Sequence, residues 1–180
     1  MIAVALDPLF AQIVALVMAL LFASGALHKL SDYRAFEGVL SAYRLMDARA
    51  VHLAAPLVIA LEVSAATLLL AGAHAMGAVL AIALLAGYAG GIALNLKRGH
   101  TQIDCGCHFG RANGRISSAL VLRNLGWCAL AATLLLPVAP RDWGALDTAA
   151  AIFGVAALAV LYLALEALIR NHQTWSEIVS

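Results

Sequence analysis

The chain has 180 residues, of which 64% are hydrophobic and 12% are charged, and its formal net charge is +1. A soluble domain carries about 25% charged residues, so a mean hydropathy of +0.94 leaves too few polar side chains to cover a water-facing surface. The composition predicts an integral membrane protein that is solvated by the lipid bilayer. The near-neutral charge and the lack of a basic stripe exclude a nucleic-acid-binding protein.

Five apolar stretches are long enough to cross a bilayer, whose core of about 30 Å needs about 20 residues of helix. The predicted spans are residues 9–27, 51–73, 76–96, 118–139 and 145–169. Residues 1–8 contain no Lys or Arg, which a secretory signal needs before its apolar run, so we expect a retained first helix. The predicted fold is all-α: a polytopic membrane helical bundle of about five transmembrane helices around a four-helix-like core, in one domain covering residues 1–180.

Two connections between spans are long enough to hold chemistry. Residues 29–49 place aromatic and apolar side chains at helical spacing between charged ones, which predicts a short amphipathic helix in the membrane interface; these are Tyr33, Phe36, Leu40 and Tyr43. Residues 97–117 are rich in glycine and contain two close cysteines. Polar residues also fall at the span ends on this side and predict one polar membrane face: His28, Lys29, His52 and Asn95.

Basic residues are distributed unequally between the two sides of a five-span chain. One side holds Lys29, Arg34, Arg44, Arg49, Lys97, Arg98, Arg111, Arg115 and Arg170, and the other holds Arg141. The positive-inside rule applies to loops this short. It predicts an N-terminus outside the cell and a cytoplasmic cysteine loop.

The cysteine pair is the strongest chemical signal in the sequence. A sharp turn at Gly106 would bring the α-carbons of Cys105 and Cys107 within the roughly 4.4–6.8 Å that a disulfide allows. Such a small ring is strained, and strained disulfides are oxidising and labile. Nearby cations favour the nucleophilic thiolate. The competing interpretation is a surface pair of unreactive thiols, although exposed free cysteines are a liability.

A metal site is an alternative use of the same segment. Four donors that suit Cu(I) or Zn(II) gather within nine positions; they are His100, Cys105, Cys107 and His108. The adjacent Cys107 and His108 make an awkward tetrahedral chelate, and the two-residue gap of a zinc knuckle is missing. Both interpretations stay open.

Glu62 is predicted to lie near the bilayer centre, about eleven residues into the second span. An ionisable residue at that depth is a functional candidate by default. We expect a neutral acid that faces the bundle interior and has no charged partner. The alternative is a neutral acid whose hydrogen bond to a neighbouring helix serves packing only.

A second polar group lies about one and a half turns into the fourth span, on the cysteine side. Arg123 and Asn124 are followed by Trp127 at helical contact spacing, whereas Cys128 is expected to be a small core residue. Arg123 either snorkels to the interface or stabilises a thiolate or a quinone head group. At 1.5 Å per residue, Glu62 and Arg123 differ in depth by roughly 9 Å. We therefore expect no direct salt bridge, with Arg123 serving the cysteine end.

Short motifs recur in a fixed order along nearly the whole chain: Ser24-Gly25, His28-Lys29, Ala42-Tyr43-Arg44, Glu62, Asn95-Leu96, Arg98-Gly99, Ile103-Asp104-Cys105-Gly106-Cys107 and Leu120-Val121-Leu122-Arg123-Asn124. With these motifs the chain resembles the MauE family of methylamine utilisation proteins. The Cys-Gly-Cys and Leu-Arg-Asn signatures are the most specific. The family is related to DoxX-like membrane proteins that are associated with redox chemistry. His108 departs from the family pattern because it precedes Phe109-Gly110, and this keeps the metal alternative open.

The resemblance implies a role in the maturation of methylamine dehydrogenase, whose small subunit is disulfide-rich, in the bacterial inner membrane. It also implies a thioredoxin-like, MauD-type partner. One hypothesis is a thiol-disulfide redox factor with Cys105, Cys107 and Arg123 in catalysis. By analogy with the disulfide-generating protein DsbB, its electrons would pass to a quinone near Arg123, Asn124 and Trp127.

The second hypothesis is a non-enzymatic membrane anchor that holds the dehydrogenase subunit and its thioredoxin-like partner together. The implied maturation takes place in the periplasm, whereas the charge count puts Cys105 and Cys107 at the cytoplasmic face. Either the count misleads, or the pair exchanges electrons on or through the membrane.

Overall fold

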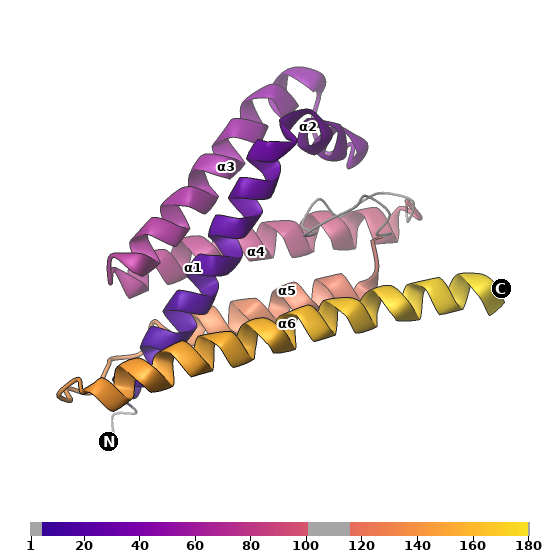
Figure 1. Ribbon diagram of the computed structural model, residues 1–180. Coiled ribbons are helices and arrows are strands. Elements are labelled where there is room, and N and C mark those ends of the chain that lie inside the picture. The colour runs from indigo at the N-terminus through magenta and orange to yellow at the C-terminus, as the bar shows by residue number, and fades with distance from the viewer. Residues whose placement is uncertain (1–4, 101–115, 180) are drawn as a thin grey trace.

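The structure is a computed structural model that describes residues 5–100 and 116–179, with side chains described through residue 168 except residue 166. Its helices are α1 (Pro8–Ser31), α2 (Tyr33–Ala42), α3 (Ala48–Leu70), α4 (His74–Lys97), α5 (Ser118–Thr133) and α6 (Ala145–Val179) (Figure 1). The described residues contain one isolated β-bridge, between Leu6 and Val138, outside any strand. The prediction of an all-α fold is confirmed.

Four helical segments in the described part of the chain are long and apolar enough to cross a membrane. They are Pro8–Ser31, Ala48–Leu70, His74–Lys97 and Ala145–Leu165. The chain is therefore a multi-pass membrane protein. The first span is longer at its carboxyl end than the apolar run from residue 9 to residue 27, and this brings Lys29 into α1.

The predicted span 118–139 is the one that differs most. Helix α5 ends at Thr133 after 16 residues, or about 24 Å at 1.5 Å per residue. Pro137 cannot donate a backbone hydrogen bond and disfavours a helical residue before it. The extended chain there pairs with the N-terminal segment instead: the Leu6 amide donates to the Pro137 carbonyl at 2.8 Å, and the Ala139 amide donates to the Leu6 carbonyl at 2.9 Å.

Three helices begin at an aspartate. The carboxylates of Asp7, Asp32 and Asp47 accept hydrogen bonds of 2.8, 3.1 and 2.8 Å from backbone amides in the first turns of α1, α2 and α3. These bonds satisfy amide groups that the helix itself leaves unpaired. The turn from α3 to α4 passes through Gly72 at φ +80°, a conformation that glycine adopts without a steric cost.

Helices α1, α3, α4 and α5 share one hydrophobic core, which agrees with the predicted four-helix-like core. Alanines and a few large side chains fill it, including Met18 and Phe22 of α1, Leu69 of α3 and Leu85 of α4. Small residues allow the helix backbones to approach closely. Helix α6 packs along α1 and leaves most of its apolar side chains exposed, as expected for a helix that faces lipid.

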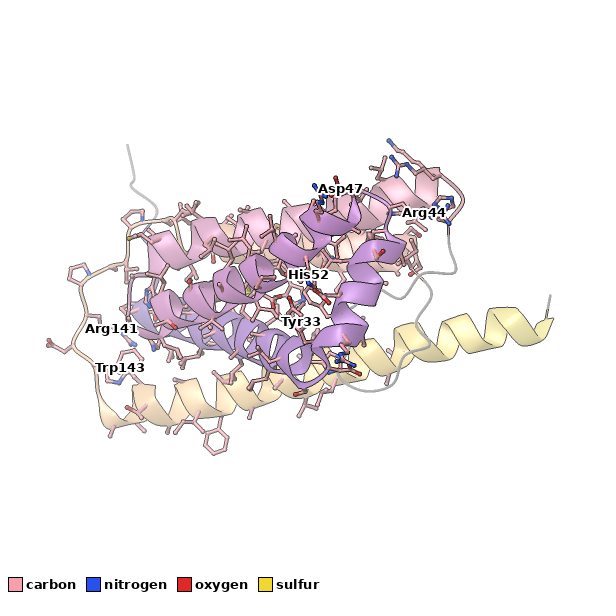
Figure 2. The ribbon with its side chains drawn as sticks, turned by 90° about the horizontal axis from the view of Figure 1, so that it is seen from above. Tyr33, Arg44, Asp47, His52, Arg141 and Trp143 are labelled. Carbon is pink, nitrogen blue, oxygen red and sulfur yellow. The ribbon has the colours of Figure 1, made fainter. Side chains whose placement is uncertain are left out.

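Helix α2 confirms the predicted short amphipathic helix. Its Phe36 is buried against Ala26 of α1 and against Ala55 and Ile59 of α3. The carboxyl ends of α1, α4 and α6 lie at one end of the bundle, and the α3–α4 turn and the α5–α6 connection lie at the other (Figure 1). Figure 2 shows Arg44 at the first end and Arg141 at the second.

Candidate functional site

A buried ion pair joins α1 and α3. The Lys29 ammonium lies 2.8 Å from Glu62 Oε1 and 2.9 Å from Glu62 Oε2. Lys29 is 4% exposed and Glu62 is 2% exposed. Removing two charges from water is costly, and their attraction offsets that cost only when further hydrogen bonds complete the geometry.

Tyr88 of α4 supplies such a hydrogen bond. Its hydroxyl donates to Glu62 Oε1 at 2.6 Å. The Lys29 ammonium also lies over two aromatic rings, 5.5 Å from the centroid of Phe36 and 5.7 Å from that of Tyr88. A cation is attracted to the negative face of a ring at such distances. Residues of four helices therefore meet around one ion pair.

This arrangement corrects two expectations from the sequence. The expectation of an unpaired Glu62 carboxylate is wrong, because Lys29 is its cationic partner. The expectation that Lys29 and Asn95 belong to a polar membrane face is also wrong, because both side chains are buried. A charge within an apolar helix is stabilised by an opposite charge on a neighbouring helix, and this places Lys29 inside the bundle.

The three polar or aromatic residues singled out on α5 lie at the same place. Arg123, Asn124 and Trp127 line a cavity of about 40 Å³ together with Lys29 and Glu62; its other lining residues are Leu21, Phe22, Gly25, Leu85, Tyr88 and Tyr162. The sequence predicted that Glu62 and Arg123 act at different depths in the membrane, but both side chains line the same cavity. A cavity of this volume has room for ordered water.

Asn124 contributes a buried side-chain amide to the wall of the small cavity. The residue is 3% exposed, and its side-chain Nδ2 has no hydrogen-bond partner within the described residues. Buried amide groups normally have partners, and an ordered water often supplies one. Trp127, which also lines the cavity, packs its ring against Tyr162 of α6 with 5.8 Å between centroids.

The cysteine pair lies outside the described residues, as does His108. Of the four candidate metal ligands, only His100 is described, and its backbone amide donates to the Asn95 carbonyl at 3.0 Å just beyond the end of α4. In the part of the chain that the structure covers, no three His, Cys, Asp or Glu side chains are grouped as a metal site would require. Cys128 is a free thiol, partly buried against the core, as the sequence predicts.

A second polar contact links α2 to the amino-terminal part of α3, where Figure 2 labels His52. His52 Nδ1 lies 2.6 Å from Glu37 Oε1. Partial desolvation, the negative charge of Glu37 and a hydrogen bond to it raise the pKa of Tyr33 above its ordinary value. This contact is exposed, and in contrast to the Lys29–Glu62 pair it is open to water.

The sequence did not indicate Lys29 or Tyr88 as site residues. One signal could have found Lys29: an acid in one apolar helix needs a cation in another, and Lys29 stands near the end of the first apolar run. No spacing rule connects Tyr88 to Glu62, because the two residues meet only through the packing of α3 against α4.

The fold and the site define a multi-pass helical membrane protein with a buried ion pair inside its bundle. Comparison with known families then matches residues 7–137 to the family model of the methylamine utilisation protein MauE. The chain belongs to this family.

Named relatives agree with the family assignment. The chain is 39% identical over 150 residues to the methylamine utilization protein MauE of Paracoccus versutus, covering 81% of this chain and 79% of the relative. It is 37% identical over 127 residues to that of Paracoccus denitrificans, covering 70% and 68%. With the Methylophilus methylotrophus protein it shares 30% identity over 168 residues, covering 91% and 87%. No solved structure matches the chain significantly.

Proposed function

We propose that this protein acts in methylamine utilisation, as a membrane factor that supports maturation of the disulfide-rich small subunit of methylamine dehydrogenase through thiol-disulfide exchange. The observation that carries the proposal is the Cys105-Gly106-Cys107 sequence, eight residues after the end of α4, in a chain of the MauE family. The family name supports the pathway, and the close thiol pair supports the proposed chemistry.

The exchange has a defined balance of atoms and electrons. A thiolate of a partner protein attacks the Cys105–Cys107 disulfide and forms a mixed disulfide. A second partner thiolate then displaces the remaining sulfur, so the partner gains a disulfide and this chain becomes a dithiol. A thioredoxin-like, MauD-type protein fits the partner role, because such proteins present a reactive thiol pair.

The dithiol must then return two electrons and two protons to an acceptor. We propose a membrane quinone as that acceptor. Arg123 is proposed as a positioning residue for the Lys29–Glu62 ion pair, because the three side chains line the same small cavity. Arg123→Ala is expected to slow reoxidation of the dithiol, while Arg123→Lys restores part of the rate because it keeps the positive charge.

Orientation in the membrane is part of the proposal. With Lys29 buried in the ion pair, the basic residues outside α1 still favour the end that holds α2 and the carboxyl end of α4. We therefore propose the bacterial inner membrane, with the N-terminus outside and the cysteine segment cytoplasmic, so that the pair exchanges electrons on or through the membrane and not directly with the periplasmic subunit. Labelling of Cys105 and Cys107 by an impermeant thiol reagent in inverted vesicles but not in intact cells is the expected result, and labelling in intact cells alone would reverse the orientation.

The redox step is tested by trapping the thiols. Membranes carrying a Cys128→Ser background are treated with a mild oxidant or reductant and then alkylated, and the mass shift of the 97–117 peptide is measured. The expected result is a shift of two alkyl groups that appears on reduction and disappears on oxidation. A pair that never cycles would sink the redox mechanism.

The double variant Cys105→Ser/Cys107→Ser separates a redox factor from a membrane anchor. If the protein is a redox factor, the variant no longer supports dehydrogenase maturation. If the protein is an anchor, the variant still supports it. Stoichiometric copper or zinc in protein purified without chelator would instead support a metal site that includes His100 and His108.

A further inference from the structure

An apolar cleft of about 260 Å³ lies beneath α2, between α3 and α4. Its rim reaches the protein surface, where Leu45 is 42% exposed and Met46 is 39% exposed. Ala83, Gly87 and Gly91 form part of its α4 wall. A cavity of about 150 Å³ is enough to admit a benzene ring. The cleft therefore has room for a substituted six-membered ring that enters from the bilayer.

Lys29 stands on the wall of this cleft and has hydrogen-bonding capacity to spare. An ammonium group has three N–H donors. Two are directed to Glu62, at 2.8 and 2.9 Å, and the third has the Gly25 carbonyl at 3.5 Å, the outer limit of a hydrogen bond. A buried donor with so weak a partner favours a ligand that carries an acceptor oxygen.

The wall around Lys29 also suits a flat ring. Phe36 and Tyr88 both line the cleft, and their rings flank the ammonium. The Tyr88 hydroxyl is bonded to Glu62 Oε1 at 2.6 Å. The phenol, the carboxylate and the ammonium thus form a continuous chain of hydrogen bonds that ends at the cleft.

A second cleft, of about 420 Å³, lies between α1, α5 and α6, but the described residues on its wall include no charged donor. It is lined by apolar and aromatic side chains and by Ser24, whose hydroxyl already donates to the Leu21 carbonyl at 2.8 Å. The cleft beneath α2 is smaller, yet it combines an apolar wall with a charged donor. The larger volume favours the second cleft as a ligand site, whereas the charged donor favours the cleft beneath α2. We give the donor more weight, because it can recognise a polar group of the ligand.

We propose that the cleft beneath α2 binds a lipid-soluble quinone, with one carbonyl oxygen accepting a hydrogen bond from Lys29. The ring lies beside Phe36 and Tyr88, and the isoprenoid tail leaves past Leu45 into the bilayer. This places the head group on the α4 side of the ion pair, rather than at Trp127.

The redox consequence rests on the proposed function. The two thiols of Cys105 and Cys107 lose two electrons and two protons as their S–S bond forms, and the quinone gains them as both carbonyls become hydroxyls. Gly91 on the cleft wall precedes the end of α4 at Lys97 by about 9 Å of helix rise. The cleft thus lies near the end of α4 from which the cysteine-bearing segment continues.

Two glycines of α4 provide a matched test of the site. A Cβ built on Gly87 or on Gly90 meets no atom within 4 Å, and Gly87 lines the cleft whereas Gly90 does not. The full-length chain in detergent micelles is titrated with a decyl-substituted benzoquinone by calorimetry. Gly87→Leu fills the cleft and is expected to raise Kd at least tenfold, while Gly90→Leu leaves Kd within twofold of the parent protein.

A second variant tests the donor. Lys29→Met/Glu62→Gln replaces the ion pair by two uncharged side chains, and the glutamine oxygen can still accept a hydrogen bond from Tyr88. The helical content measured by circular dichroism is therefore expected to persist. Quinone affinity is expected to fall at least tenfold. Unchanged affinity in this variant or in Gly87→Leu would overturn the proposal. So would equal displacement of the quinone by a phospholipid, because that would make the cleft a lipid site.

The cysteine-free variant Cys105→Ser/Cys107→Ser separates this inference from the redox proposal. It is expected to bind the decyl benzoquinone with unchanged Kd. Loss of cysteine cycling with intact binding would remove the thiol mechanism and keep the quinone site. Failure of the parent protein to bind the probe, with cycling intact, would remove the quinone site and keep the thiol mechanism.

Discussion

Replacing Lys29 by methionine removes a buried positive charge from the bundle while keeping an unbranched side chain of similar length. The Glu62 carboxylate, with 3% of its side chain exposed, is then left without its cation and retains the Tyr88 hydroxyl as a hydrogen-bond donor. Breaking a buried ion pair by removing one partner costs about 3–5 kcal/mol. We expect the free energy of unfolding of Lys29→Met to fall by about that amount.

The neutral double variant distinguishes the charge from the packing. Lys29→Met/Glu62→Gln leaves no unpaired charge, and replacing a whole buried pair is often close to neutral. We expect it to lie within about 1 kcal/mol of the parent protein, so the two substitutions are strongly non-additive. Glu62→Gln alone leaves the Lys29 ammonium unpaired and is expected to be destabilising, in contrast to the mild effect that an unpaired acid would predict.

Reversible unfolding by sodium dodecyl sulfate in mixed micelles, followed by far-ultraviolet circular dichroism, measures these differences. Lys97→Met is the control, because Lys97 is exposed in the last turn of α4 and surface substitutions usually change stability by less than about 0.5 kcal/mol. A Lys29→Met protein within about 1 kcal/mol of the parent would refute the reasoning. A double variant as unstable as the sum of its single variants would do the same.

Two further predictions concern other parts of the bundle. A Cβ on Gly77 would lie 2.7 Å from Leu69 Cγ and 3.1 Å from the Leu69 backbone nitrogen. Gly77→Ala is therefore expected to lower the free energy of unfolding by about 1–3 kcal/mol through overpacking. A Cβ on Gly90 meets no neighbour, so Gly90→Ala is expected to be neutral or slightly stabilising in the same assay. Desolvation and the neighbouring Glu37 favour the neutral phenol of Tyr33 and raise its pKa. Its resonance in ¹³C-tyrosine spectra, assigned with Tyr33→Phe, is therefore expected to titrate at higher pH than a free tyrosine. Glu37→Gln is expected to shift that titration to lower pH, and an unchanged titration would show that Glu37 is not a cause of the raised pKa.

The sequence alone was sufficient for the class of protein and for most of its helices. Apolar runs of about 20 residues leave few alternatives to membrane-spanning helices, because the bilayer core offers no other partners to backbone amides and carbonyls. The cysteine pair, Glu62 and the Arg123–Asn124–Trp127 group were also identifiable, because residue type and depth in a span single them out.

Only the tertiary structure decided how the polar residues are partnered. Lys29 and Glu62 are 33 positions apart, and the end of an apolar run gives no sign of whether a lysine turns outward to the interface or inward to an acid. Lys29 points inward because α1 packs against α3, since a buried ammonium is tolerated only where a carboxylate lies on the facing helix. Tyr88 and the cleft beneath α2 arise in the same way, from helix packing that no local pattern encodes.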